Sequence, residues 1–131
     1  MIAAAAGYGY KEYNRKPTDV AGITPAAKLS ADEIVNQYNS DEATANKLYL
    51  GKTIQVSGTI TEITNQQDTL VNVLMGDTSA MHKVSCLLEP AYIAAIRQYN
   101  AGQQIIIKGI CTGYLMDVEL NRCVIVKDGQ R

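Results

Sequence analysis

Alternation of apolar and polar residues is clearest in the stretch Gly51-Lys52-Thr53-Ile54-Gln55-Val56-Ser57-Gly58-Thr59-Ile60. Its aliphatic side chains fall on one face, and its hydroxyl and amide side chains fall on the other. A period of two residues with one apolar face is typical of a half-buried β-strand. The alternation shifts by one residue between Ile60 and Ile63, which predicts a bulge or a sharp bend there.

The same design returns later in the chain, in Gly102-Gln103-Gln104-Ile105-Ile106-Ile107-Lys108-Gly109. Both stretches begin at a glycine, which allows a turn directly before the strand, and both carry a second glycine near the strand centre. A small closed barrel requires strands that coil sharply at such glycines. The two stretches therefore predict two strands of one barrel.

Three further strands are predicted. One covers residues 70–75, after a turn at 65–68, and the next starts at His82 and ends at Leu88. The last covers 118–126, with an irregularity near Asn121-Arg122.

Two helices are expected, one before the first strand and one between the third and fourth strands. Ser30-Ala31-Asp32-Glu33 is a capping box, in which Ser and Glu satisfy two backbone donors at a helix start. One helix is predicted from there to Gly51, a typical stop. Between the third and fourth strands, Pro90 followed by Ile93, Ile96 and Tyr99 predicts a short helix.

The element order predicts a mainly β fold, a five-stranded OB-type Greek-key barrel with an N-terminal helix and a short helix between strands 3 and 4. An SH3-like barrel is the alternative, and the helix between strands 3 and 4 favours the OB-type barrel. The domain organisation follows: residues 1–29 form an extended leader, and residues 30–131 form the capped helix and the barrel.

The leader starts with an apolar run, Met1 to Ala6, that is far shorter than the ~20 residues of a membrane span. Tyrosines and then Lys11, Arg15 and Lys16 follow, as at the interfacial end of a membrane anchor. One interpretation is the remnant of an N-terminal anchor. The other is a tail that packs on its own domain or on a second copy, which would allow self-association.

The composition limits the function classes. The chain has 131 residues, with 12 basic and 13 acidic side chains and a net charge of −1. Dedicated nucleic-acid-binding domains usually carry a basic excess, so generic binding to a phosphate backbone is disfavoured. There is no Phe and no Trp, so the eight Tyr carry all the aromatic surface.

Several stretches of the chain together match one known family. They are Ser30-Ala31-Asp32-Glu33, Ala43 to Lys52, Val56-Ser57-Gly58, Cys86, Lys108 to Tyr114 and the segment Tyr13-Asn14-Arg15-Lys16-Pro17. On these residues the chain resembles the tRNA_anti-like OB-fold family of uncharacterised bacterial proteins, which are often membrane-anchored or lipoprotein-like. The resemblance implies an OB-fold, a location in the cell envelope and no known activity, with the cytoplasm as the alternative location. A full anchor or a lipobox cysteine is missing from the N-terminus.

Nucleic-acid binding would need aromatic and basic side chains on the second and third strands. Residues 70–75 contain neither, and the third strand offers only His82 and Lys83. Tyr114, placed in the loop between strands 4 and 5, is the best remaining ligand-binding candidate, together with Arg122 and Lys127. The alternative is that Tyr114 only covers one end of the barrel.

No catalytic, metal or cofactor motif is present. The chain has a single histidine, and no P-loop, dinucleotide fingerprint or H-E-x-x-H. His82 and Cys86 face the same side of a strand, but at strand rise they stand about 13 Å apart, which excludes activation of a thiolate. We therefore expect no enzyme activity, no catalytic residue, no metal and no cofactor.

The three cysteines leave two alternatives. They are free buried thiols, or Cys111 and Cys123 oppose each other in a hairpin and form a disulfide, with Cys86 left over.

These observations together predict a non-enzymatic OB-fold binding or interaction module in the bacterial envelope, with a protein, peptide or glycan ligand. A single-stranded nucleic-acid-binding or tRNA-binding OB domain is the alternative.

Overall fold

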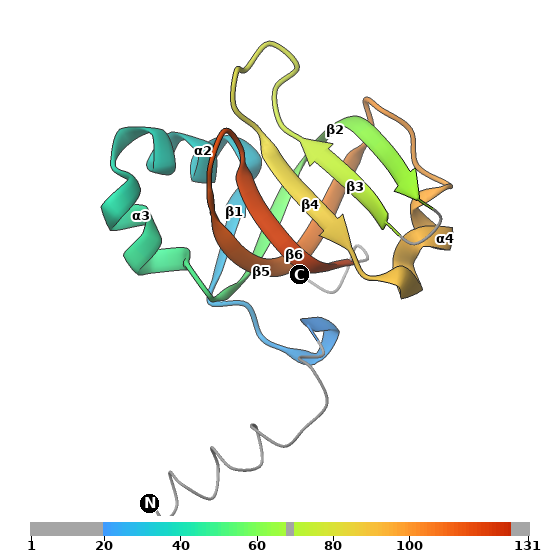
Figure 1. Cartoon of the computed structure of the whole chain (residues 1–131), viewed down its shortest axis with the longest axis horizontal. Coiled ribbons are helices and arrows are strands. Elements are labelled where there is room, and N and C mark those ends of the chain that lie inside the picture. The colour runs from blue at the N-terminus through green and yellow to red at the C-terminus, as the bar shows by residue number, and fades with distance from the viewer. Residues whose placement is uncertain (1–19, 68–69, 127–131) are drawn as a thin grey trace, which may run out of the picture.

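The computed structural model describes residues 20–67 and 70–126 (Figure 1). Its elements within these residues are the 3-10 helix η2 (Val20–Gly22), β1 (Ala27–Ser30), α2 (Ala31–Ser40), α3 (Glu42–Tyr49), β2 (Thr53–Gln67), β3 (Leu70–Met75), β4 (Val84–Leu88), the 3-10 helix η3 (Pro90–Tyr92), α4 (Ile93–Ile96), β5 (Gln104–Tyr114) and β6 (Val118–Ile125).

Five strands close into a barrel in the order β2-β3-β4-β6-β5, with β5 returning to β2. The pairs are antiparallel except for β4 and β6, which run parallel. This is the Greek-key arrangement of an OB-fold, with the short η3 and α4 segment between the third and fourth barrel strands. The predicted fold class is therefore confirmed.

The strand β2 belongs to both halves of the barrel. Residues 53–59 pair with β5, and residues 60–67 pair with β3. The register shifts between Ile60 and Glu62, at the bulge that the change of alternation predicted. The predicted turn at 65–68 is wrong in its position, because pairing with β3 continues to Gln67 and keeps the strand extended.

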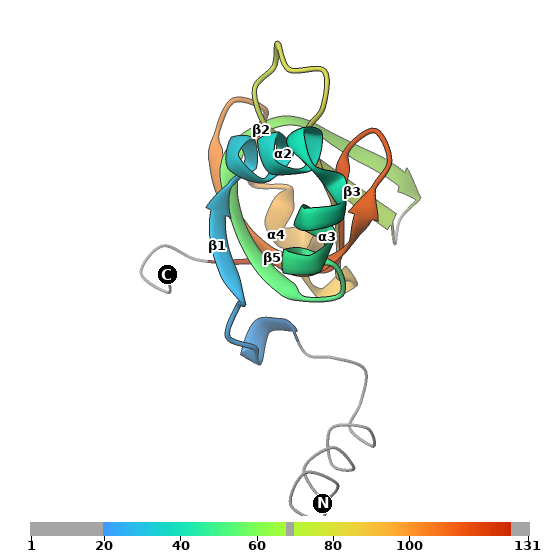
Figure 2. The same ribbon diagram turned by 90° about the vertical axis from the view of Figure 1, so that its left-hand side faces the viewer.

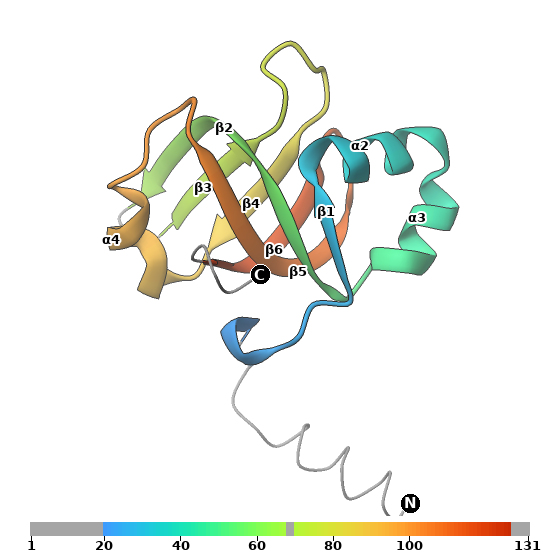
Figure 3. The ribbon, with the colours of Figure 1, turned by 180° about the vertical axis from the view of Figure 1, so that it is seen from behind.

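The described part of the predicted leader begins with the 3-10 helix η2 and ends in a strand. Ala27–Ser30 form β1, which pairs in parallel with residues 54–57 of β2. Val20 is buried, and the ammonium of Lys108 donates to the carbonyl oxygen of Ile23 at 2.8 Å. Val20, Ile23 and residues 27–30 therefore contact the barrel. Figure 3 shows β1 beside β2. The predicted anchor remnant and the tail for self-association lie in residues 1–19, outside the described residues.

The single predicted helix is two helices. The capping box of Ser30 and Glu33 starts α2 as predicted. Asp41 then adopts an extended backbone, with φ −159° and ψ 91°, and ends α2. Its carboxylate accepts hydrogen bonds from the backbone N–H and the hydroxyl of Thr44, at 3.2 and 2.8 Å, which starts α3. An aspartate that caps a new helix competes with continuation of the old one.

The two helices cover one end of the barrel, in front of the barrel opening in Figure 2. Ile34 and Tyr38 of α2 and Ala45 and Tyr49 of α3 are buried in the core. The shorter α4 contributes the buried Ile93 and Ile96 to the core.

None of the helices in residues 20–67 and 70–126 is long and apolar enough to span a membrane.

Candidate functional site

The outward face of β3 and β4 is the surface on which OB-folds bind oligonucleotides. Alternate residues of the two strands are buried, so the remaining ones form this face. The amide of Asn72 donates to the hydroxyl of Ser85 at 2.8 Å across the strand pair. The face consists of Leu70, Asn72 and Leu74 on β3 and of Ser85 and Leu87 on β4.

One carboxylate borders this face on each of the neighbouring strands β2 and β6. Glu62 of β2 pairs with Leu74, and Glu119 of β6 pairs with Ser85. The five positions on β3 and β4 hold no aromatic ring on which a base could stack and no cation that could meet a phosphate. Arg122 lies at the β6 bulge between Leu120 and Cys123, with φ 54°, and is the cation nearest to the face along β6.

His82 and Lys83 lie before β4 and not within it, which corrects the predicted strand start. His82 Nδ1 hydrogen-bonds to the carbonyl oxygen of Met116 at 2.5 Å, and the backbone N–H of Lys83 donates to Asp117 at 2.9 Å. The ammonium of Lys83 donates to the carbonyl oxygen of Ala80 within its own loop, at 2.7 Å. These residues fasten the loop 76–83 to the hairpin turn 115–117.

Tyr114 is the last residue of β5, not a loop residue as predicted, because it still pairs with Val118. Its ring stacks on that of Tyr38 at a centroid distance of 5.2 Å, and its other neighbour is the edge-on ring of His82 at 5.8 Å. The structure thus brings Tyr114, His82 and Lys83 together at one barrel end, whereas Arg122 lies four residues along β6 from Val118, about 13 Å at strand rise. Lys127 lies outside the described residues.

Three exposed apolar side chains at this end were not among the binding residues predicted from the sequence. Met81 and Leu115 are each 81% exposed, and Met116 is 67% exposed. They stand on the two loops that the His82 and Lys83 hydrogen bonds join, and together we call them the loop-end surface. Apolar residues at the tip of a hairpin, where polar ones are usual, were the signal that could have revealed them.

The cysteines are all free, which corrects the alternative of a disulfide between Cys111 and Cys123. Cys111 pairs with Leu120 across β5 and β6, so Cys123 does not stand opposite to it. The Cys111 thiol instead hydrogen-bonds to the Tyr38 hydroxyl at 3.3 Å, and Cys123 contacts Cys86.

Burial sets the protonation of these groups. Burial, followed by the hydrogen bond with Cys111, raises the pKa of the Tyr38 hydroxyl well above its usual range. Burial, followed by the contact with Cys86, raises the pKa of the Cys123 thiol. Both groups are therefore neutral at physiological pH and unsuited to act as nucleophiles. The part of the chain that the structure describes holds no cluster of three or more His, Cys, Asp or Glu side chains suited to a metal ion.

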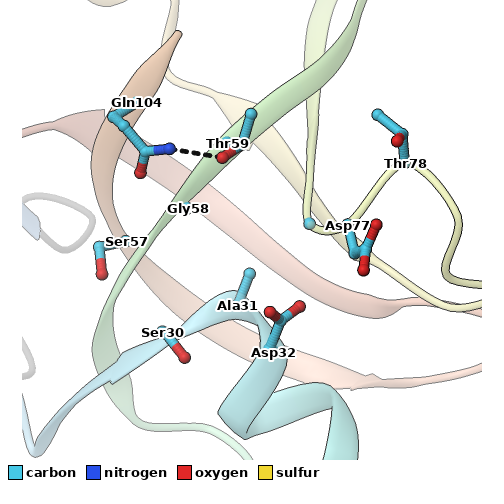
Figure 4. A pocket seen from close by; sticks show the side chains of 10 residues that line it. Ser30, Ala31, Asp32, Ser57, Gly58, Thr59, Asp77, Thr78 and Gln104 are labelled. Carbon is cyan, nitrogen blue, oxygen red and sulfur yellow. Dashed lines mark hydrogen bonds between the residues drawn. The ribbon is translucent and has the colours of Figure 1, made fainter. Parts of the chain in front are cut away.

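A pocket of about 460 Å³ lies where β2 changes its neighbour from β1 to β3. In Figure 4 the side chains of Asp32 and Asp77 lie at one end of it, and those of Ser57 and Gln104 at the other. The amide of Gln104 donates to the Thr59 hydroxyl. Asp77 accepts hydrogen bonds from the backbone and hydroxyl of Ser79, which lower its pKa.

Comparison with known proteins identifies one matching family and several solved structures with a similar fold. A family model described as tRNA_anti-like matches residues 1–125. A solved "putative nucleic acid-binding lipoprotein" from Klebsiella pneumoniae is similar, with TM-score 0.62 and 20% identity over 86% of this chain and 100% of that chain. A "putative aspartyl-tRNA synthetase" from Leishmania major has TM-score 0.52 and 10% identity over 95% of this chain and 26% of that chain. No curated protein matches the chain.

Proposed function

The chain belongs to the tRNA_anti-like family, and we propose that it is a non-catalytic OB-fold binding module whose partner is a protein rather than a nucleic acid. The observation that carries the proposal is the outward face of β3 and β4, which has no aromatic ring and no cation and is bordered by Glu62 and Glu119. A phosphate backbone would meet carboxylates there without the counter-charges that supply most of its affinity.

The loop-end surface supports a protein partner. Met81, Leu115 and Met116 expose apolar side chains on two loops that the hydrogen bonds of His82 and Lys83 hold together. Methionine adapts its shape to apolar partners, and exposed apolar clusters mark interaction surfaces. In this proposal Tyr114, His82 and Lys83 position the loops, and the methionines and Leu115 make the contact.

We place this module in the bacterial envelope. The support is the segment that leads from the apolar start of the chain to Lys11, Arg15 and Lys16, together with the lipoprotein description of the Klebsiella protein. Fractionation of cells that carry the full-length protein tests the location. Recovery with the membranes or the periplasm agrees with the proposal, and recovery with the cytosol contradicts it.

The partner class is tested by two measurements on the same protein. Fluorescent single-stranded DNA and RNA are titrated at low salt and again at high salt, and we expect no binding at either. A photo-crosslinking amino acid at position 116 is compared with one at Ala94, an exposed position on α4. We expect one discrete protein adduct from position 116 only. Salt-sensitive binding of the oligonucleotides would overturn the proposal in favour of the nucleic-acid alternative.

A further inference from the structure

The amide of Gln55 opens on a pocket, although the residue is only 6% exposed. It makes no hydrogen bond within the part of the chain that the structure describes, and its polar atoms are not fully shielded from water. The other buried polar side chain, Lys108, is different, because its ammonium donates to the carbonyl oxygen of Ile23. An amide that faces water in a pocket and has no protein partner can pair with a ligand that displaces that water.

Gln55 lines a second pocket, of about 310 Å³, on the outward face of β1, β2 and β5. Lys28 lies directly opposite Gln55 on β1, and both side chains line this pocket. Ser30 and Ser57, the next outward pair of the same two strands, line this pocket and the 460 Å³ pocket of Figure 4 alike. The two pockets therefore adjoin, and we call them together the β2 groove, with Gln55, Ser57 and Thr59 along its floor.

The two ends of the β2 groove carry opposite charges. At one end the ammonium of Lys28 is exposed, with no ion pair or hydrogen bond among the described residues. Glu33 also lines that end, but its carboxylate accepts the N–H of Ser30 at 2.8 Å in the capping box. At the other end stand the carboxylates of Asp32 and Asp77. The walls between the ends offer hydroxyl and amide groups beside the apolar side chains of Ala31 and Ile106.

The length of the groove selects the size of its ligand. Gln55 and Thr59 are four residues apart on β2, which corresponds to about 13 Å, and the Asp77 end lies beyond Thr59. An extended peptide advances at most about 3.3–3.6 Å per residue, so about four residues span this distance.

We propose that the β2 groove binds a short peptide with free termini, about four residues long. Its terminal carboxylate meets Lys28 and the amide of Gln55, and its terminal ammonium meets Asp32 and Asp77. The serine and threonine hydroxyls and Gln104 face the peptide groups in between. The β2 groove shares no residue with the loop-end surface, so neither proposal depends on the other.

The test is a titration of the full chain with tetra-alanine, followed by amide NMR shifts and by calorimetry. Three matched peptides are compared with it: the N-acetylated form, the C-terminal amide and the form blocked at both ends. We expect shifts in residues 28–32 and 55–59 with tetra-alanine, and binding at least about tenfold weaker for each singly blocked peptide.

Two variants link the binding to the residues. Lys28→Met keeps the length of the side chain and removes its charge, and Gln55→Met fills the same space without an amide. We expect each to weaken tetra-alanine binding about tenfold or more. The matched control is Lys47→Met, which removes an exposed lysine on α3 that lines neither pocket, and which leaves the affinity unchanged.

Equal binding of the blocked and free peptides would overturn the proposal, as would the absence of binding up to roughly 10 mM tetra-alanine. The same holds if Lys28→Met and Lys47→Met behave alike. Lys28 is exposed, so its variant folds even if Gln55→Met does not. Crosslinking from position 116 is independent of these results, which separates failure of the groove from failure of the loop-end surface.

Discussion

The ring of Tyr114 stacks on the ring of Tyr38, with 5.2 Å between the centroids and 24° between the planes. This contact joins the end of β5 to the buried face of α2. The edge of the His82 ring completes the cluster from the loop 76–83. Three segments distant in sequence therefore meet at the end of the barrel that carries the loop-end surface.

Replacing Tyr114 by alanine removes this stack. We expect Tyr114→Ala to lower the free energy of unfolding by about 2 kcal/mol, because it loses both apolar burial and the aromatic pair. Tyr114→Phe serves as the control, since the Tyr114 hydroxyl has no hydrogen bond among the described residues. Urea denaturation measures both. A Phe variant as unstable as the Ala variant would show that the ring stack is not the source of the stability.

The raised pKa values of Tyr38 and Cys123 predict a loss of stability in alkali. In the unfolded chain these groups ionise near their ordinary pKa values of 10.0 and 9.0, whereas the fold keeps them neutral. Below about pH 9 both groups are neutral in the folded and the unfolded chain, so the free energy of unfolding does not change with pH. Above the ordinary pKa of each group, its ionisation in the unfolded chain lowers the free energy of unfolding by up to about 1.4 kcal/mol per pH unit.

Chemical denaturation from pH 7 to 11 measures this effect. We expect a flat profile to about pH 9, then a decline, and a shallower decline above pH 10 for Tyr38→Phe. A Tyr38→Phe profile parallel to that of the unaltered protein would contradict the assignment to Tyr38.

Gly109 lies against the next strand. A Cβ atom there would stand 2.6 Å from the Cys123 sulfur and 3.1 Å from the carbonyl oxygen of Asn121. We expect Gly109→Ala to destabilise the fold by about 3 kcal/mol, because a backbone neighbour cannot move aside cheaply.

A double mutant distinguishes the clash with the Cys123 sulfur from the clash with the Asn121 carbonyl oxygen. Cys123→Ala alone removes a buried sulfur and costs about 1 kcal/mol, but in the Gly109→Ala background we expect it to restore part of the loss. Thermal unfolding of the three variants measures the coupling. Strictly additive losses would show that the sulfur is not the obstacle.

The cysteines give a direct thiol count. All three are buried and free, so we expect no reaction with a thiol reagent in the folded protein and three equivalents after unfolding without reductant. A single equivalent after unfolding, with Cys111 and Cys123 linked in a peptide map, would instead restore the disulfide that the sequence left open.

Substitutions in the loop-end surface are expected to weaken binding of the protein partner without changing the stability of the fold. Met116→Ser and Leu115→Ser alter exposed side chains, so the free energy of unfolding is expected to stay within about 0.5 kcal/mol. Crosslinking to the protein partner from Met81 is expected to fall in both. Leu48→Ser, at a position that is 50% exposed on α3, is the control and keeps the crosslink. Loss of the crosslink in the control as well would point to a different contact surface.

Much of the fold could be predicted because its signals are local. The strand predicted over 70–75 matches β3, and the Ser30 and Glu33 pair forms the predicted capping box. Gly51 follows the helices with φ 78°, as a helix stop requires. The irregularity near Asn121-Arg122 is also present, with Arg122 at φ 54°. Each of these features depends on a few neighbouring residues.

The break at Asp41 shows a local signal that was overlooked. Asp41 followed by Glu42 and Thr44 has the composition of a helix start, but the apolar spacing continues across it. The parallel strand β1 is different, since Ala27–Ser30 carry no strong strand pattern and become a strand only because β2 offers a free edge. Pairing with a distant segment supplies hydrogen bonds that the local sequence does not reveal.

By itself, the sequence determined the strand periodicity, the capped helix start, the order of elements and hence the barrel, because backbone preference and apolar spacing act over a few residues. Only the tertiary structure decided that Tyr114 stacks on Tyr38, that Cys111 meets that tyrosine rather than Cys123, and that Lys28 lies opposite Gln55. Strand register and the closing of the barrel bring these side chains together across large separations in sequence. Those juxtapositions, and not the residue types alone, form the surfaces on which the function is proposed.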